Sequence, residues 1–507
     1  MIDLAASADA LSLLSSSLTP WLIVIPGIII GLIFGATPGL QISMAMAIFL
    51  PMTLHMDFMQ AMLFLTAIFT GGSFGSGIPA ILMNIPGTSS AIATAFDGYP
   101  MARKGLHNQA LGIALASSVF GVLVGYLILF MLIQPISLMV LKLGPSEMFM
   151  VILWGMTLIA SLRGEHMLKG LIAGFAGLLI GTIGFNEIGM ARGTLGSFYL
   201  FDGIPVIPAM MGMFAASELF RLANKQYIVE SDASRKVDLG KIIKGFKMAF
   251  ASPLVMLRGC LIGVFVGAVP GVGSSVSNLL SYVETKRRDA DPDSFGKGNP
   301  KGIVASESAN STSEAGSMAT LLALGIPGGG ATAVMLAAFA MHNITGGPQF
   351  IREQTDIVYA IIFANFAQVF FLMILGILLI PLLANIIKVP MRYLIPSVLV
   401  LAVFGSFGLT GNFVGPFTVL AFAIIGWLMR RYGYSVPAAV IGILLGAMAE
   451  KTLLHSYQIS GGDISYILER PVTLIILFLL LISLFGKHFM MLIRGLFQRK
   501  PSLSSAD

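Results

Sequence analysis

The chain has 507 residues, of which 56% are hydrophobic and only 11% are charged, whereas about a quarter of the residues in a soluble domain are charged. This composition, with a mean hydropathy of +0.90, indicates a polytopic all-α membrane protein. The net charge of +6 does not indicate nucleic-acid binding, because Lys and Arg lie in short loops between apolar runs. A single Cys excludes an internal disulfide and a multi-Cys metal site.

An apolar run near the N-terminus is broken by a Pro-Gly pair, and a similar run recurs in the second half. Residues 31–43 read GLIFGATPGLQIS, and residues 263–275 read GVFVGAVPGVGSS, an offset of 232 (263 − 31). Proline removes a backbone donor and clashes with the preceding turn, so each pair predicts a broken helix. The glycines before each pair also fit ordinary close helix packing, and this alternative stays open.

A second pair of motifs follows the first. Residues 84–94 read NIPGTSSAIAT, and residues 325–335 read GIPGGGATAVM, an offset of 241 (327 − 86). The nine extra residues (241 − 232) fall in the polar loop 284–302. The two halves therefore carry the same two breaks in the same order, which predicts an internal repeat.

The loop charges predict how the repeats are oriented. Basic loops are assigned to the cytoplasm, and loops 51–58, 185–203, 342–356 and 450–465, which are poor in Lys and Arg, are assigned to the outside. The loop between the motifs is free of Lys and Arg in the first half and basic in the second, so the repeats are expected to be inverted. The number of membrane crossings agrees with this assignment of the loops if residues 21–50 and 253–283 each enter the membrane and turn back.

These patterns predict about 12 spanning or re-entrant segments. The N-terminal membrane repeat is expected over residues 1–222, a cytoplasmic linker over 223–252, and the inverted C-terminal repeat over 253–507. The N-terminus is expected in the periplasm and the C-terminus in the cytoplasm. Non-helical backbone at membrane depth is tolerated only inside protein or beside a wet cavity, so the breaks are expected at a central site.

The residues around the four breaks are suited to hold an anion without a basic side chain. A broken helix exposes backbone N–H groups and the positive end of the helix dipole, and no Lys or Arg lies in the four stretches. For any single hydroxyl, bonding to its own helix is an equal alternative. The predicted substrate-binding residues are Pro38, Gly39, Gln41, Ser43, Pro86, Gly87, Thr88, Ser89, Pro270, Gly271, Ser274, Ser275, Asn278, Pro327, Gly328, Gly329, Gly330 and Thr332.

A polar run precedes the fourth break and is a candidate for ion coupling. Glu307 and Glu314 are two helical turns apart and share a face with Asn310. Oxygen ligands of this kind can hold Na⁺, and an intramembrane carboxylate can carry a proton. Glu307 could instead lie at the cytoplasmic interface, and Asp97 reads as a helix-end or loop residue. The predicted ion-coupling residues are Glu307, Asn310, Ser311, Thr312 and Glu314.

The sequence contains no signature of an enzyme. Neither a G-x-x-x-x-G-K-[ST] phosphate loop nor an H-E-x-x-H motif is present, and no cofactor or resident metal is expected. A secondary transporter is therefore the first hypothesis. An anion channel built on the same hairpins and an intramembrane enzyme are the two alternatives.

The motifs resemble those of the large permease subunit of the tripartite tricarboxylate transporters, the TctA family. The matching strings are GATPGLQISMAMAIFLPMT (35–53), ILMNIPGTSSAIATAFDGYPMARKG (81–105), GAVPGVGSSVSNLLSYVETKR (267–287) and SEAGSMATLLALGIPGGGATAVMLAAF (313–339). Two departures stand at Gln41-Ile42, where small residues are expected, and at Ser311-Thr312-Ser313, in a stretch usually richer in Asn and Ala.

The resemblance implies a permease of the bacterial inner membrane that imports di- or tricarboxylates by secondary active transport. It implies two partners, a small TctB-like membrane subunit and a periplasmic TctC-like binding protein, and symport driven by Na⁺ or H⁺. Alternating access is the expected mechanism, and an elevator-like movement of the Pro-Gly hairpins is one form of it. The binding protein sets much of the substrate choice, so the chain does not identify the carboxylate.

Overall fold

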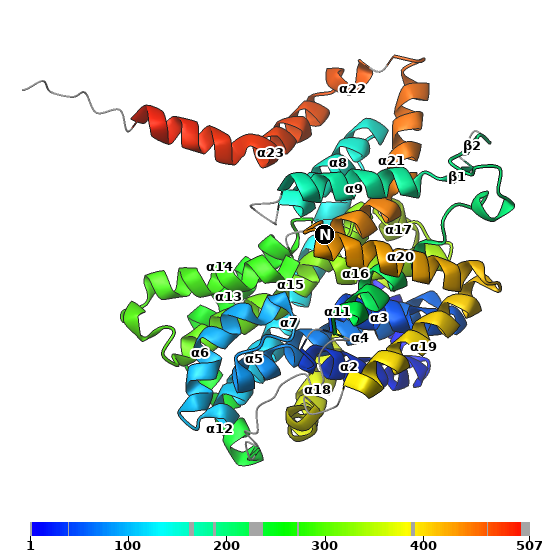
Figure 1. The fold of residues 1–507 in the computed structure, drawn as a ribbon. Coiled ribbons are helices and arrows are strands. Elements are labelled where there is room, and N and C mark those ends of the chain that lie inside the picture. Colours follow the sequence, from blue (N-terminus) through cyan, green and yellow to red (C-terminus); the bar gives the residue numbers. More distant parts are fainter. Residues whose placement is uncertain are drawn as a thin grey trace, which may run out of the picture.

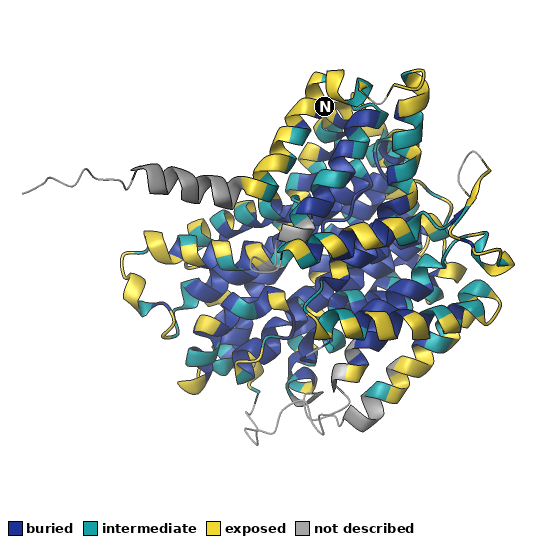
Figure 2. Ribbon diagram, turned by 45° about the horizontal axis from the view of Figure 1, so that its top comes forward, coloured by how far each residue is buried: buried dark blue, intermediate teal, exposed yellow. Residues whose placement is uncertain are grey.

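The computed structural model describes residues 3–38, 40–161, 167–185, 189–222, 237–270, 273–386, 391–463 and 465–497. This part of the chain is helical apart from one short antiparallel pair, β1 (Gly184–Phe185) and β2 (Ala191–Arg192). The helices pack into one body with a continuous buried interior and an exposed rim (Figure 2). The prediction of an all-α polytopic protein is confirmed.

The helices of the first half run from α1 to α11. They are α1 (Leu4–Ser15), α2 (Thr19–Ala36), α3 (Ile42–Phe49), η1 (Leu50–His55), α4 (Phe58–Gly75), α5 (Gly77–Met83), η2 (Ser89–Ala91), α6 (Ile92–Arg103), α7 (His107–Val140), α8 (Pro145–Ser161), α9 (Met167–Gly181), η4 (Phe198–Leu200), α10 (Val206–Met210), η5 (Met211–Ala216) and α11 (Ser217–Leu222).

The second half begins with α12 and ends with the long arm α23, which leaves the body in Figure 1. Its helices are α12 (Leu239–Ala249), α13 (Pro253–Gly267), α14 (Gly273–Arg288), η6 (Pro292–Ser294), α15 (Pro300–Leu324), α16 (Gly330–Met341), α17 (Pro348–Glu353), α18 (Thr355–Ile386), α19 (Met391–Thr410), α20 (Val414–Arg431), α21 (Val436–Ile459), α22 (Tyr466–Glu469) and α23 (Pro471–Phe497).

Six described helical stretches are long and apolar enough to cross a bilayer. They are α2, α4 with α5, α7, α18, α20 and α21, and the bent pair α12–α13 makes up to seven. Further apolar helices, among them α8, α9 and α16, are shorter than a full span. Short apolar helices that meet end to end are typical of broken or re-entrant membrane segments.

All four predicted breaks interrupt helices in the structure. α2 ends before Pro38 and α13 before Pro270. α5 ends at Asn84, which has a φ of 59°, and α15 ends at Gly325, which has a φ of 67°. A left-handed residue of this kind closes a helix, and Gly and Asn adopt it most easily.

The two halves use the glycines of their first motif in the same way. α2 packs along α4, where a β-carbon at Gly31 or Gly35 would collide with the backbone of Ile68 or Gly72. α13 packs along α15, where Gly263 and Gly267 meet the backbone of the polar run in the same close manner. These glycines therefore permit close approach of helices, as the packing alternative predicted.

Two contacts join connections that the loop charges assign to the outside. The ring of Phe58 lies 5.5 Å from the ring of Phe350, which joins loops 51–58 and 342–356. Arg192 forms an ion pair with Glu450, which joins loops 185–203 and 450–465.

The basic connections are joined to one another in the same way. Lys104 Nζ donates to the carbonyl of Lys297 at 2.7 Å, and Lys169 Nζ donates to the carbonyl of Tyr432 at 2.7 Å. These contacts agree with the grouping of loops that the positive-inside rule gives.

Candidate functional site: four helix breaks beside a buried polar helix

The first and fourth breaks lie against each other. A β-carbon at Gly330, the first residue of α16, would lie 3.2 Å from Ser43 Cβ in the first turn of α3. The first break also meets the second, because a side chain at Gly87 would collide with the carbonyl of Gly35 near the end of α2.

The third break completes this arrangement. Asn278 of α14 accepts from the backbone N–H of Ala93 in the first turn of α6 at 3.0 Å, which joins the third break to the second. A β-carbon at Gly273 would lie 3.9 Å from the carbonyl of Gly328, which joins the third break to the fourth. The structure thus brings together four breaks that are spread over about 290 residues, a proximity that sequence spacing alone does not give.

The predicted substrate-binding residues differ in burial and in whether their side chains already form hydrogen bonds within the protein. Asn278 and Thr332 are buried, and their side chains already form hydrogen bonds within the protein. Thr332 Oγ1 accepts from the backbone N–H of Gly329 at 2.9 Å. Thr88 is likewise bonded to Ser90 at 2.7 Å. The buried residues at the breaks also include Pro38, Gly87, Pro270, Pro327 and Gly328. The half-buried residues are Gln41, Ser43, Pro86, Ser274, Gly329 and Gly330, and Ser89 is exposed.

Three predicted positions are outside what the structure describes. Gly39 and Gly271 lie outside the described residues, and so does the side chain of Ser275.

Helices begin directly after the breaks. Three of them, α3, α14 and α16, start within three residues of the Pro-Gly pair that precedes each helix. The fourth, α6, follows the short turn η2. The first N–H groups of a helix lack partners within the helix and carry partial positive charge. Because the breaks are adjacent, these helix starts lie in one region, which is chemically suited to a carboxylate.

Two elements that the sequence did not single out border the breaks. η5 is a π-helical turn, and the ring of its Phe214 lies 3.6 Å from the position of a Gly330 β-carbon. Gly155 of α8 lies beside Pro270, since a β-carbon there would be 3.4 Å from Pro270 Cβ. A π-helical turn is frequent at functional sites, but its wider turn has no clear sequence signature.

The candidate coupling residues lie on α15, which is buried along most of its length. Glu314 is fully buried, and its Oε1 accepts from Thr70 Oγ1 at 2.7 Å and from Tyr126 OH at 3.0 Å. Its other carboxyl oxygen, Oε2, has no hydrogen-bond partner among the described residues.

Glu307 is also fully buried within the protein. Thr94 Oγ1 donates to its Oε1 at 2.5 Å, and Ser118 Oγ donates to its Oε2 at 3.0 Å. Both glutamates are therefore surrounded by neutral hydroxyls from α4, α6 and α7. An isolated carboxylate charge is costly in such a place, so each carboxyl needs a proton or a cation.

Two more oxygens on the same part of α15 lack partners within the described chain. Asn310 donates from Nδ2 to the carbonyl of Ser73 at 3.1 Å, but its Oδ1 is buried without a partner, as is Ser311 Oγ. Asn310 and Glu314 are four residues apart, so their side chains are neighbours on one helix face. Buried unpaired acceptors of this kind are costly unless a donor or a cation meets them.

The remaining hydroxyls of the polar run stabilise the helix itself. Thr312 donates to the carbonyls of Ser308 and Gly121, at 2.5 and 3.1 Å, and Ser313 donates to the carbonyl of Asn310 at 2.6 Å. Of the five predicted coupling residues, Thr312 is thus the one whose hydroxyl hydrogen is already used.

The polar interior continues beyond Glu314 along α4. Thr66 lies one turn from Thr70, and Gln368 of α18 donates to Thr66 Oγ1 at 3.0 Å and to the carbonyl of Leu63 at 3.2 Å. The sequence analysis missed Thr66, Thr70, Ser118, Tyr126 and Gln368. Their signal was a polar residue recurring at helical spacing within an apolar run, which is weak for each residue alone.

Asp97 is a buried residue within α6, so its interpretation as a helix-end or loop residue is wrong. Its Oδ1 accepts from the backbone N–H groups of Gly296, Gly298 and Asn299 at 2.9, 2.8 and 2.7 Å, and its Oδ2 accepts from Tyr282 OH at 2.9 Å. Asp97 therefore holds the α14–α15 connection on α6.

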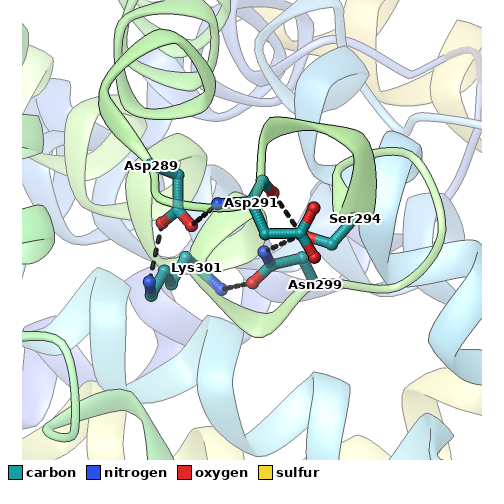
Figure 3. A network of polar contacts seen from close by, with 5 residues as sticks. All are labelled: Asp289, Asp291, Ser294, Asn299 and Lys301. Carbon is teal, nitrogen blue, oxygen red and sulfur yellow. Dashed lines mark hydrogen bonds and ion pairs between the residues drawn. The ribbon is translucent and has the colours of Figure 1, made fainter.

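The same connection is ordered from within by a second network (Figure 3). Lys301 Nζ lies 2.6 Å from Asp289 Oδ2, and the backbone N–H of Asp291 donates to Asp289 Oδ1 at 3.1 Å. Asn299 Nδ2 donates to Ser294 Oγ at 2.8 Å. The nine residues by which the second repeat is longer thus fall in an ordered turn that packs on α6.

A family model described as the tripartite tricarboxylate transporter TctA family matches residues 21–441. The chain belongs to this family. An uncharacterised 52.8 kDa protein of the TAR-I ttuC' 3' region of Agrobacterium vitis is 32% identical over 447 residues, 88% of each chain. A second protein of this organism, from the TAR-II ttuC' 3' region, is 30% identical over 210 residues, 41% of this chain and 87% of its own. No solved structure matches the chain.

Proposed function

We propose that this TctA-family protein is the permease subunit that moves an organic di- or tricarboxylate across the bacterial inner membrane, driven by an ion gradient. The substrate carboxylates bind where the four helix breaks meet, and α15 carries the coupling ion. A periplasmic binding protein delivers the substrate, and a small membrane subunit completes the complex.

The adjacency of the four breaks is the observation that carries this proposal. Ser43 beside Gly330, and Asn278 on the N–H of Ala93, place helix starts from both halves in one region. Neutral N–H groups and hydroxyls bind a carboxylate without a fixed opposite charge, which favours release after transport.

The inverted repeat gives the proposal its mechanism. Matched packing of α2 on α4 and of α13 on α15, together with the swapped basic loops, supports two halves of opposite orientation. Inverted halves that bind at their common boundary are typical of alternating access. An elevator-like movement is one form of this mechanism.

Coupling is proposed at Glu314, with Asn310 and Ser311 as the other oxygen ligands. Their unpaired buried oxygens need a cation or a proton, and Glu314 lies about 21 Å along α15 from its first residue, by the rise of 1.5 Å per residue. Either H⁺ or Na⁺ satisfies this requirement. Glu307 is a second protonatable group, half that distance along the helix.

The experiment that tests the site is uptake into proteoliposomes containing the permease with its small subunit and binding protein. Gly329 has a φ of −172° and nothing within 4 Å of a β-carbon in the described part of the chain, so Gly329→Leu fills the breaks without displacing the backbone. Uptake of a radiolabelled tricarboxylate should fall roughly tenfold or more.

The matched control is Gly408→Leu, because Gly408 of α19 is exposed and also has nothing within 4 Å of a β-carbon in the described part of the chain. The control should transport normally. Normal uptake by Gly329→Leu would show that the substrate does not bind at the breaks. Uptake that does not saturate, or that proceeds without the binding protein, would favour the channel alternative.

A further inference from the structure

α12 lies at the edge of the molecule, in the part of the chain expected to be a linker (Figure 1). Its buried face consists of Ile242, Gly245 and Ala249. A β-carbon at Gly245 would collide with the backbone of Gln109, so α12 packs closely on the first turn of α7. The contact fixes the orientation of α12 and leaves its other face free.

The orientation of α12 follows from its junction with α13, where the two helices meet at 79°. The exposed face of α13 is apolar, with Leu254 73% exposed and Phe265 65% exposed at its two ends. An apolar face of this kind is stable in the hydrocarbon of a bilayer. If α13 enters the hydrocarbon, as expected for the segment 253–283, the angle of 79° brings α12 close to the plane of the membrane surface.

The free face of α12 is basic. Lys241, Lys244 and Lys247 are all exposed, and the acidic side chain beside them is Asp238, 3.9 Å from Lys241. Within the described residues, Lys244 and Lys247 have no acidic partner. Two exposed positive charges without an acidic partner among the described residues therefore lie on this face.

Apolar side chains flank these lysines. Leu239, Ile243 and Phe250 are 42%, 45% and 47% exposed. An in-plane helix with Lys on one side and large apolar side chains beside them is suited to the boundary between headgroups and acyl chains. Arg258, in the second turn of α13, is long enough to reach the same level from within the membrane.

We propose that α12 and the start of α13 form a binding site for the phosphate headgroups of anionic phospholipids in the cytoplasmic leaflet. Lys244 and Lys247 bind the headgroups, and Leu239, Ile243 and Phe250 insert between the lipids. A lysine close to an anionic surface strengthens association about fivefold, so the two together contribute roughly thirtyfold. The site does not depend on the transported substrate.

The test uses the purified full chain in a neutral detergent, with added dioleoyl phosphatidylglycerol or dioleoyl phosphatidylcholine. Retained lipid is measured by native mass spectrometry, and the thermal unfolding midpoint is measured in parallel. The wild type should bind the anionic lipid more tightly, and Lys244→Gln with Lys247→Gln should weaken that binding roughly thirtyfold.

The control, Lys286→Gln with Lys297→Gln, removes the same charge from exposed positions in another loop that the positive-inside rule assigns to the cytoplasm. It should bind phosphatidylglycerol like the wild type, and so should Lys244→Arg with Lys247→Arg, which keeps the charge. Equal binding of both lipids by the wild type, or equal loss in both glutamine variants, would overturn the proposal, and the face would then be assigned to a protein partner.

Discussion

Glu314 combines three features at one residue: complete burial, two hydroxyl donors on one oxygen and none on the other. A structural carboxyl is normally satisfied at both oxygens, as Glu307 is. The unsatisfied oxygen is the reason for which we propose Glu314, and not Glu307, as the residue that binds the coupling ion.

Glu314→Gln should keep the fold but change the ion dependence. The amide oxygen still accepts from Thr70 and Tyr126, whereas the charge that binds a cation or a proton is lost. Proteoliposome uptake should lose its response to imposed Na⁺ or pH gradients, falling roughly tenfold when the gradient is the driving force. Ser313→Ala, which removes a hydroxyl bonded to its own helix, serves as the control. An unchanged Na⁺ and pH profile in Glu314→Gln would exclude it from coupling.

Asp97→Ala should destabilise the protein. The change leaves three partly buried N–H groups and the buried Tyr282 hydroxyl without their acceptor, at a cost of about 3 kcal/mol. Asp97→Asn should cost less, because its amide oxygen still accepts and its N–H₂ group can donate to Tyr282. Thermal unfolding in detergent, with limited proteolysis near Gly296, measures both; equal midpoints for the two variants would contradict the assigned contacts.

At the scale of elements, the sequence predicted the breaks because proline and glycine act locally. It did not predict which breaks meet, because a contact such as Ser43 with Gly330 depends on tertiary packing. The side chains around Glu307 and Glu314 were missed for the same reason: Thr70 and Ser118 are ordinary residues of apolar helices until α15 packs on them. The linker was predicted as a loop region, and its described part forms α12.

The α14–α15 connection should weaken slightly in acid. The hydrogen bond from Lys301 and the N–H of Asp291 hold the pKa of Asp289 below its usual value. The charged form is thus favoured in the folded state, so this stabilisation is present above the pKa of the unfolded chain, about 3.9, and is lost as the pH falls below it.

Asp289→Asn should accordingly lower the unfolding midpoint at neutral pH, by about 1 °C, and have a smaller effect near pH 3. Thermal unfolding scans of both proteins between these limits give the comparison. A difference that grows on acidification would have the wrong sign.

At the scale of the whole molecule, the membrane topology distinguishes an inverted from a parallel arrangement of the two halves. The connection before α4 and the connection before α15 occupy equivalent places in the two halves and should face opposite sides of the membrane. Cys260 is buried, so a Cys260→Ser background suits thiol labelling.

In that background, Leu54→Cys should react with a membrane-impermeant maleimide in intact spheroplasts, because Leu54 is 44% exposed in a connection that the loop charges assign to the outside. Asp291→Cys, in an exposed turn, should react only after permeabilisation. Labelling of both from one side would contradict the inverted arrangement.

The meeting of the breaks has a consequence for how such a chain can diverge. Gly330 of the second half lies against Ser43 of the first, and Asn278 accepts from the N–H of Ala93, so neither half by itself contains the whole proposed site. A substitution at one break should therefore be tolerated only with a matching substitution at the residue that it contacts in the other half. Recombination that exchanges one half between two relatives should yield proteins that fold but transport poorly, until paired changes at these contacts restore the match.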